Sequence, residues 1–292
     1  MVVQFAIRVV KYAKELHNLN MDITFDTIYK NEKNVFHGHA IDLQKGTWFD
    51  PWAMGLACLK AIEFKDQSDK QFLLPSDVNM LSYLKRMHLH ELFSELTYKT
   101  FLSPLEKTEV NEKDNDHVCE IIHCIFRDEL NARLGKINRM FSSFGLTEAE
   151  ASMATSLVGE LGNNVFDHND GQWPTSVRGA IILAQMNPLK GRIEVIVADP
   201  GIGFRRSLAA LDPSVTNDAD AIKLGLSGVT GRIGERRGQG LRIVQNWTIN
   251  NFAGIVRIHS GSGLVVVDEK GTRAENVFSI GGTLASFVVK SK

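Results

Sequence analysis

Hydrophobic and polar positions alternate in short runs along the first hundred residues. Residues 21–29 place Ile23, Phe25 and Thr27 at every second position, between polar residues. A period of two is typical of a strand, so we expect one there. Residues 40–43 and 72–74 predict two further short strands.

One helix is predicted between these strands and a second one after them. Asp50 is a helix-capping residue type and Pro51 suits a first helical turn, so we expect a helix from there to about residue 64. A second helix is expected at residues 79–87. Strands and helices that alternate at these lengths indicate an α/β domain, which we assign to residues 1–105.

A polar segment at residues 103–116 divides the chain and has no apolar period, as expected of a domain boundary. Residues 117–144 then carry apolar side chains at helical spacing, so we interpret residues 106–145 as a linker with one long connecting helix. Gly145 would end that helix. Thr147 and Glu150 form a capping-box pattern that opens the next helix, in a domain at residues 146–292.

The first candidate site lies on that next helix. Glu160, Asn164 and His168 are four positions apart and share one helix face, while Leu161 and Val165 lie on another. A carboxylate and an amide one turn apart can serve as a general base and a metal ligand. The same pattern alone also fits a polar face turned to solvent, with a histidine near the helix C-terminus.

A second candidate follows an apolar run. Asp199 ends the strand expected at residues 193–199 and precedes Gly201 and Gly203. A carboxylate there can accept a hydrogen bond from an exocyclic amine, and the glycines let the backbone approach a flat base. An ordinary strand-to-turn junction is the alternative.

Two glycine-rich segments complete the set. Gly238 and Gly240 open an amphipathic helix whose free N–H groups favour a phosphate, and Arg236 and Arg237 add positive charge beside it. One such segment is a weak signal by itself. Thr283 follows two glycines at the start of a final strand and can present its hydroxyl to a ligand.

In this order the four segments resemble the N box, D-x-G-x-G box, G-x-G-L box and late Gly-Thr of the GHKL ATPase family, which includes histidine kinases and anti-sigma-factor serine kinases. The resemblance covers about residues 145–290. It implies the two-layer α/β sandwich of that family, the Bergerat fold, with a mixed sheet covered by helices on one face. The expected strands are residues 177–183, 193–199, 255–259, 264–268 and 284–289.

The resemblance also implies roles for the candidate residues. Asn164 would hold Mg²⁺ on the phosphates of ATP, one turn from His168. Asp199 would bind the adenine amine, with Thr283 supporting it through water. Residues 204–237 would form a lid over the nucleotide. Arg232, Arg236 or Arg237 would face the phosphates. The remaining implied ATP contacts come from His168, Gly201, Gly203, Gly238, Gly240 and Leu241.

Glu160 resembles the general base of family members that hydrolyse ATP or phosphorylate a serine. The spacing E-x-x-x-N-x-x-x-H is most similar to the anti-sigma-factor kinases, although the lid here is longer. The resemblance implies an ATP-binding regulatory protein whose nucleotide site and lid control a protein partner. Three alternatives stay open: an ATPase with Glu160 as the base, a serine kinase acting on a separate partner, and a stress or phage-response sensor whose output domain lies on another chain.

The N-terminal half resembles a STAS domain, the fold of anti-sigma-factor antagonists. The resemblance rests on the strand at 41–43, on Trp48-Phe49-Asp50 and on the helix that follows. Phosphorylatable members carry a serine after the aspartate, where this chain has Pro51 and Trp52. Neither accepts a phosphoryl group, so the resemblance implies a degenerate docking or sensing module.

Composition restricts these interpretations. Hydrophobic residues make up 43% and charged residues 23% of the chain, and the net charge is −1. Such a balance gives no global attraction to nucleic acid or a membrane surface. No apolar run reaches the roughly 18 residues that span a bilayer. We expect a cytoplasmic protein without a membrane or nucleic-acid partner.

Cysteine and histidine positions suggest little metal chemistry. The three cysteines are too few for a disulfide framework. Cys119 and His123 would share a face of the predicted connecting helix, but Cys124 turns away, which favours buried residues over a zinc site. The apolar stripe of that helix is either core or the seam of a homodimer.

Overall fold

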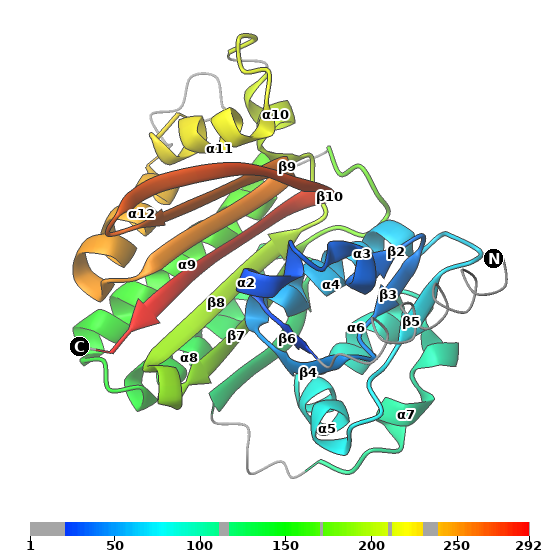
Figure 1. Ribbon diagram of the computed structural model, residues 1–292. Helices are drawn as coiled ribbons and strands as arrows, with labels where there is room; N and C mark the ends of the chain where they lie inside the picture. Colours follow the sequence, from blue (N-terminus) through cyan, green and yellow to red (C-terminus); the bar gives the residue numbers. More distant parts are fainter. Residues whose placement is uncertain (1–20, 111–116, 170–171, 210–211, 230–238, 292) are drawn as a thin grey trace, which may run out of the picture.

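The structure is a computed structural model, and it describes residues 21–110, 117–169, 172–209, 212–229 and 239–291. Figure 1 shows helices and strands throughout, which confirms the α/β class. The strands are β1 (Met21–Ile23), β2 (Phe36–His37), β3 (Ala40–Asp42), β4 (Gly46–Phe49), β5 (Gln71–Leu73), β6 (Val118–Cys124), β7 (Ala180–Asn187), β8 (Arg192–Asp199), β9 (Ile255–Asp268) and β10 (Gly271–Lys290). The helices are α2 (Phe25–Ile28), α3 (Glu32–Val35), α4 (Pro51–Phe64), α5 (Val78–Arg86), α6 (Leu89–Glu95), α7 (Ser103–Glu106), α8 (Arg127–Ser143), α9 (Glu148–Asn169), α10 (Gly203–Leu208), α11 (Asp218–Leu226) and α12 (Gly240–Phe252).

The central element is a five-stranded sheet in the order β6-β7-β8-β10-β9. Every pairing in it is antiparallel. The mixed pairing that the resemblance implied for this sheet is therefore wrong there. It occurs instead in the small sheet β2-β3-β5, where β3 pairs antiparallel with β2 and parallel with β5.

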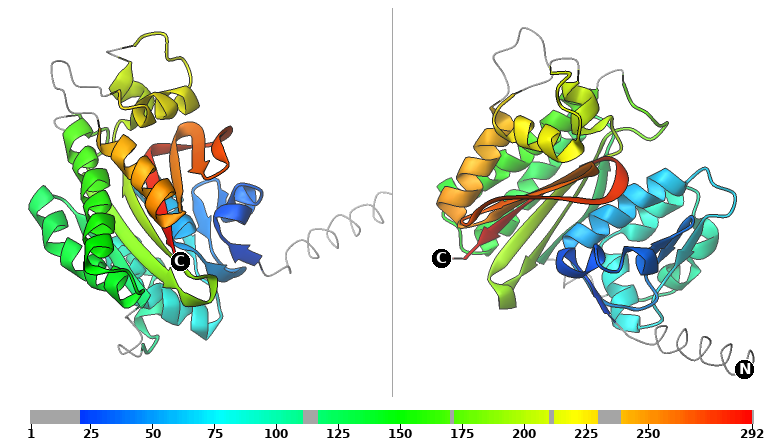
Figure 2. Two further views of the ribbon diagram at one scale, coloured as in Figure 1. Left: turned by 90° about the vertical axis from the view of Figure 1, so that its left-hand side faces the viewer. Right: turned by 45° about the horizontal axis from the view of Figure 1, so that its top comes forward.

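Both faces of the five-stranded sheet are covered (Figure 2). Helices α8, α9 and α12 pack on one face, and α4 of the N-terminal half packs on the other. Side chains of β8 alternate between the two cores: Val195 and Val197 face the α9 side, whereas Ile196 and Ala198 face the α4 side. The described helices that follow β6 therefore cover one face of the sheet, as expected, and the N-terminal half adds a third layer on the other face.

Helix α4 begins where the sequence predicts. The Ala53 N–H donates to Asp50 Oδ1 at 2.9 Å, and Pro51 occupies the first turn. Nearly all residues of this helix are buried, so its sequence has no distinct polar face. Gly55 lets it approach the sheet closely, because a Cβ at this position would lie 2.6 Å from Leu284 Cδ1.

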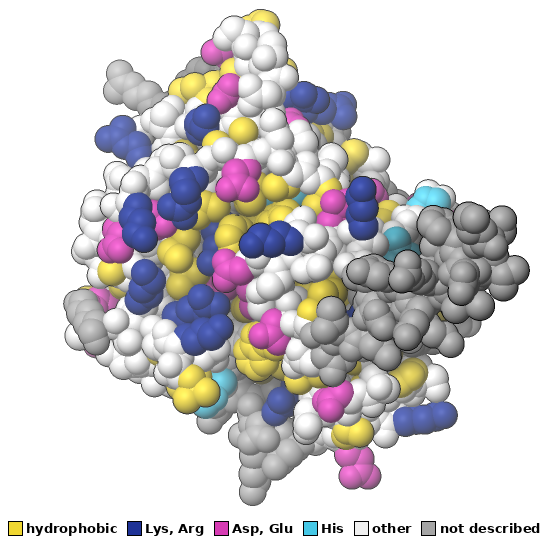
Figure 3. Space-filling model, in the orientation of Figure 1, with side chains coloured by type: hydrophobic (Ala, Val, Ile, Leu, Met, Phe, Trp, Pro, Cys, Tyr) yellow, Lys and Arg dark blue, Asp and Glu magenta, His cyan; other side chains and the backbone are white. Residues whose placement is uncertain are grey.

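A groove lies between α2 and the β9–β10 hairpin. Its wall is apolar at Phe25, Leu264 and Val266, and charged at Lys30 and Glu275. On the face seen in Figure 3, hydrophobic side chains show between charged ones in the middle of the molecule. Close to this groove, the buried Arg257 pairs with Glu194, and its guanidinium lies 4.2 Å from the Phe25 ring centroid.

Residues 21–29 do not form a single strand. The strand β1 ends at Ile23, and residues 25–28 turn into α2. Thr24 makes this turn, since its N–H donates to Thr27 Oγ1 at 3.0 Å and its carbonyl accepts from the Ile28 N–H at 2.8 Å. Side-chain capping of this kind outweighs the weak period-two signal of so short a segment.

The connecting helix expected at residues 117–144 is also wrong in its first third. Residues 118–124 form β6, which pairs with β7, and helix begins only at Arg127. Val118 and Ile121 face the α4 side, Cys119 and Cys124 face the α9 side, and the register shifts between Cys119 and Ile122. A strand buried on both faces and broken by a bulge gives apolar spacing that matches a helix.

The other expected elements lie close to their predicted positions. Gly145, at φ +98°, follows α8, and the Thr147 hydroxyl and Glu150 carboxylate hydrogen-bond at 2.9 Å at the start of α9. The strand expected at 177–183 begins later, as β7 at Ala180. The two strands expected at 255–259 and 264–268 are one continuous strand, β9. The division into residues 1–105, 106–145 and 146–292 stays a prediction.

Candidate functional site

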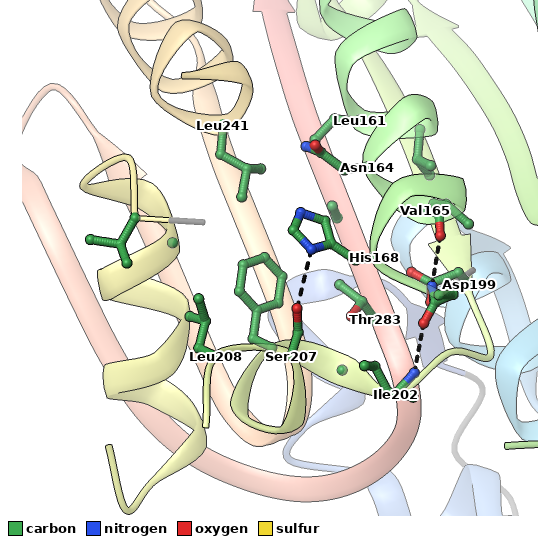
Figure 4. Close-up of a pocket in the computed structure, with 17 residues that line it drawn as sticks. Leu161, Asn164, Val165, His168, Asp199, Ile202, Ser207, Leu208, Leu241 and Thr283 are labelled. Atoms are coloured by element: carbon green, nitrogen blue, oxygen red, sulfur yellow. Dashed lines mark hydrogen bonds between the residues drawn. The ribbon is translucent and has the colours of Figure 1, made fainter. Parts of the chain in front are cut away.

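A pocket opens between α9, the sheet and the α10–α11 segment (Figure 4). It encloses about 640 Å³ of atom-free space, part of it open to solvent. Its wall is mostly apolar, which is typical of small-molecule sites. The lining residues are Leu161, Asn164, Val165, His168, Asn169, Val197, Asp199, Ile202, Gly203, Phe204, Ser207, Leu208, Gly225, Val229, Leu241, Thr283 and Ala285.

Asp199, the last residue of β8, is the buried charge of this pocket. Its side chain is 6% exposed. Burial raises its pKa to about 7, while hydrogen bonds from Gly201 and Asn169 act in the opposite direction. A carboxyl group with a pKa near 7, kept away from water in a pocket, is a candidate for a functional residue.

Asn169, the last residue of α9, holds that carboxylate in place. Its amide Nδ2 donates to Asp199 Oδ1 at 3.0 Å and to the Val165 carbonyl at 2.8 Å. Its Oδ1 accepts from the Ile202 N–H at 2.8 Å. The sequence does not indicate this role, because Asn169 adjoins the Glu160-Asn164-His168 stripe without belonging to it.

Close contacts require glycine at positions 201 and 203, which follow Asp199. A Cβ at Gly201 would lie 2.1 Å from Asn169 Oδ1, and the Gly201 N–H donates to Asp199 Oδ1 at 2.9 Å. Gly203 has φ +74°, and a Cβ there would lie 2.8 Å from Ser260 Oγ. These positions therefore admit no larger residue without a shift of the turn.

Thr283 lies directly beside Asp199, since the two residues are register partners on β10 and β8. Its hydroxyl is 3.3 Å from that of Ser260 on β9. Ser260 is 1% exposed, and its hydroxyl also donates to the Gly282 carbonyl at 3.0 Å and accepts from the Phe204 N–H at 3.1 Å. Ser260 thus joins the sheet to α10, a role that the sequence did not indicate.

Glu160 and Asn164 lie at the other end of the pocket region. A Cβ at Gly240, the first residue of α12, would be 2.6 Å from Glu160 Oε2 and 3.7 Å from Asn164 Nδ2. The Asn164 Nδ2 atom is buried and has no hydrogen-bond partner among the described residues. Asn169 lies nine positions after Glu160 on α9, a rise of roughly 13 Å, so the site suits an elongated ligand.

His168 lies between these two ends. Its Nδ1 is 3.1 Å from the Ser207 hydroxyl on α10 (Figure 4). Leu241 lines the pocket from α12. The predicted residues that line the pocket are therefore Asn164, His168, Asp199, Gly203, Leu241 and Thr283, with Glu160, Gly201 and Gly240 beside it.

The α10–α11 segment is anchored to β9. Asp218, at the start of α11, accepts hydrogen bonds from the Ser262 N–H at 2.8 Å and from its hydroxyl at 2.9 Å. Arg205 on α10 pairs with the same carboxylate at 3.2 Å. This segment corresponds to the described part of the expected lid. Arg232, Arg236, Arg237 and Gly238 lie outside the described residues.

No model of a known protein family matches this chain, and no curated protein sequence matches it either. The described residues contain no group of three or more His, Cys, Asp and Glu side chains arranged to hold a metal ion. None of the described helices is long and apolar enough to cross a bilayer.

Proposed function

We propose that this chain binds ATP, with Mg²⁺ on its phosphates, in the pocket between α9 and the sheet. In this proposal nucleotide binding controls contact with a protein partner. The observation that carries the proposal is the buried Asp199 carboxylate, whose Oδ1 is held by Asn169 and Gly201 while the side chain lines an apolar pocket. An acceptor fixed in this way is suited to the exocyclic amine of adenine.

The Asp199 end of the pocket fits a planar base. Val197 and Ala285 provide apolar walls from the sheet, and Ile202 and Leu208 face them from the turn and α10. A base stacked in such a site loses contact with water on both faces, which favours binding. Thr283, as the register partner of Asp199, is placed to bind a water beside the base.

The Glu160 end fits phosphates. The N-terminus of α12 presents free backbone N–H groups and the positive end of the helix dipole. The Asn164 Nδ2 atom is buried without a described partner, so it is free to donate a hydrogen bond to a phosphate oxygen. Mg²⁺ takes oxygen ligands and is commonly bound by one or two protein groups together with substrate phosphates, so the Asn164 Oδ1 atom with the phosphates would be a sufficient set for it.

ATP supplies a transferable phosphoryl group when it is bound. Glu160, beside Gly240 at the start of α12, is placed to accept a proton from a water or a hydroxyl at that end. In hydrolysis a water reaches this carboxylate, and in transfer a hydroxyl of a partner reaches it. In simple switching neither reacts. We propose the switch as the primary function and membership of the GHKL family, anti-sigma-factor kinase type, as its basis.

The N-terminal half serves, in this proposal, as a docking or sensing module of STAS type. Asp50 is 3% exposed and Trp52 is 0% exposed, and both lie in the layer packed against the sheet. The segment that carries the phosphoacceptor in STAS domains is thus inaccessible here. This burial supports a module that transmits binding to the sheet rather than one that is phosphorylated.

A Mg-ATP titration by calorimetry tests the proposal. We expect saturable binding to the purified chain and its loss in Asp199→Asn, because an amide nitrogen would face the adenine amine. The matched control is Asp268→Asn, at the far end of β9, which should bind as the wild type does. No binding to the wild type, or equal binding to both variants, would contradict the proposal.

Two further assays separate the alternatives. Steady phosphate release that disappears in Glu160→Gln would favour an ATPase over a switch. Transfer of label to an added protein would favour a kinase. Binding with neither activity supports the switch.

A further inference from the structure

We propose that Asn169 positions Asp199 so that a single carboxylate oxygen, Oδ2, faces the ligand, and that Asn169 thereby selects bases with an exocyclic amine over those with a carbonyl. This inference rests on the proposed function and deepens it. Asn169 acts through Asp199 and through the turn that follows, so it is a positioning residue.

The orientation of the Asn169 amide is fixed by its partners. Nδ2 faces two acceptors, Asp199 Oδ1 at 3.0 Å and the Val165 carbonyl at 2.8 Å, while Oδ1 faces the Ile202 N–H at 2.8 Å. A flipped amide would oppose all three. The side chain is 3% exposed, so water does not replace these partners.

The same contacts leave the two oxygens of Asp199 unequal. Oδ1 accepts from Asn169 Nδ2 at 3.0 Å and from the Gly201 N–H at 2.9 Å. No described residue donates to Oδ2, and the side chain lines the pocket, as Figure 4 shows. A ligand that donates an N–H to Oδ2 completes the site. A carbonyl oxygen at the same place meets a buried negative charge and is rejected.

Asn169 also sets the shape of the turn. A Cβ on Gly201 would lie 2.1 Å from Asn169 Oδ1, so the backbone passes directly over the amide. The bond to the Ile202 N–H fixes the residue that precedes α10. One side chain therefore positions both the acceptor of the base and the turn that covers it.

The role of Asn169 should be visible in the pH dependence of ligand binding, because Asn169 affects the protonation of Asp199. Burial raises the pKa of Asp199 to about 7, and the Asn169 hydrogen bond opposes that rise. Loss of this bond would raise the pKa further, so the pH below which binding weakens would move upward. Among the described titratable residues lining the pocket, His168 on α9 is the other group that could contribute, so it requires its own control.

The test measures the affinities for ADP and IDP from pH 6 to pH 9. The base of ADP carries an exocyclic amine where the base of IDP carries a carbonyl. The ratio of the two affinities cancels any titration of the phosphates. For the wild type we expect a preference for ADP that falls as the pH drops through about 7. In Asn169→Leu, ADP affinity at pH 7 should fall about tenfold, because a hydrogen bond to a charged group is lost. The midpoint, meaning the pH at which half of the preference for ADP is lost, should rise by about one pH unit.

Three other variants make the result decisive. Asn169→Asp keeps the side-chain shape and should raise the midpoint further, since two adjacent carboxyl groups share a proton. His168→Gln should leave the midpoint near the wild-type value. Gln185→Leu removes another buried amide, one bonded to the Tyr83 hydroxyl at 3.3 Å, and should leave both midpoint and preference unchanged.

Each outcome has a definite meaning. A wild type that binds neither nucleotide refutes the proposed function. A wild type that prefers ADP, with Asn169 variants that are folded and keep the same preference and midpoint, refutes the role of Asn169 alone. Equal shifts in Gln185→Leu would also refute it, because the effect would then be a general loss of packing.

Discussion

The hydroxyl of Tyr29, the residue that follows α2, lies 3.1 Å from Nδ1 of His259 on β9. His259 Nε2 is 3.0 Å from the Phe278 carbonyl, which can only accept, so Nε2 carries the proton and Nδ1 accepts from Tyr29. The Trp52 Nε1–H donates to the same Tyr29 oxygen at 3.0 Å. His259 precedes Ser260, which holds the pocket turn, so this chain of hydrogen bonds ends one residue from the candidate site.

Removing the Tyr29 hydroxyl should destabilise the whole protein. Tyr29→Phe leaves the buried Trp52 N–H and His259 Nδ1 without partners, at a cost of about 1–3 kcal/mol. Because the N-terminal half and the sheet share one hydrophobic core, we expect a single cooperative transition in urea, shifted to lower concentration.

The matched control is Tyr98→Phe. The Tyr98 hydroxyl donates to the Ala61 carbonyl at 3.2 Å within the N-terminal half, so its loss leaves one acceptor rather than a donor and an acceptor. A smaller shift is expected. Two separate transitions in Tyr29→Phe, or a shift no larger than in the control, would contradict the coupling of the two halves.

The sequence predicted most of the elements that build the candidate site. Glu160, Asn164 and His168 lie on α9 as expected, and Asp199 ends β8 beside Thr283. These predictions succeed because helix spacing and strand ends are local properties. The adjacency of Asp199 and Thr283 depended on the resemblance, since no local pattern places β10 next to β8.

Tertiary contacts explain what the sequence did not predict. Asn169 acts through a bond to Asp199, thirty positions away in the chain, and Ser260 through bonds to Phe204 and Gly282. The packing of α4 on the sheet was missed because a helix buried all round has no polar face to reveal its orientation. The β6 strand was missed because both of its faces are apolar.

Asp199→Asn should stabilise the protein without ligand even as it abolishes binding. The folded pKa of Asp199, about 7, lies above its ordinary value of 3.8, so the native state binds the proton more tightly than the unfolded state. Wild-type stability from this group therefore falls as the pH rises from about 4 to about 7 and is then constant. The gain from the variant should grow over the same range and exceed roughly 1 kcal/mol at pH 8.

Urea unfolding at pH 5 and pH 8 measures this difference. Asp50 has a pKa that burial also raises to about 7, so both proteins retain the slope that it contributes. The comparison between the variant and the wild type removes that shared term. A gain that is larger at pH 5 than at pH 8 would mean that Asp199 is not the buried charge described.

Gly282→Ala should disrupt the pocket through the backbone. Gly282 has φ +90°, and a Cβ there would lie 1.9 Å from the Asp199 carbonyl oxygen. We expect the free energy of unfolding to fall by at least ~2 kcal/mol, and we expect ADP binding to be lost. The neighbouring Gly281→Ala has nothing within 4 Å of its added Cβ, so it should change stability by less than about 0.5 kcal/mol. Equal effects of the two substitutions, measured by urea unfolding, would be inconsistent with this contact.

Gly240→Ala should separate stability from phosphate binding. Gly240 begins α12, where alanine is the better helix former by up to about 1 kcal/mol, so unfolding should not become easier. The added Cβ would lie 2.6 Å from Glu160 Oε2, in the space between that carboxylate, Asn164 and the helix N-terminus. We expect Mg-ATP affinity to fall about tenfold or more while adenosine affinity stays within about twofold, because the base end of the pocket is untouched.

Calorimetry with Mg-ATP and with adenosine measures these two affinities. A parallel loss of adenosine binding would show that Gly240 lies against the base, and would reverse the direction in which we place the nucleotide along α9.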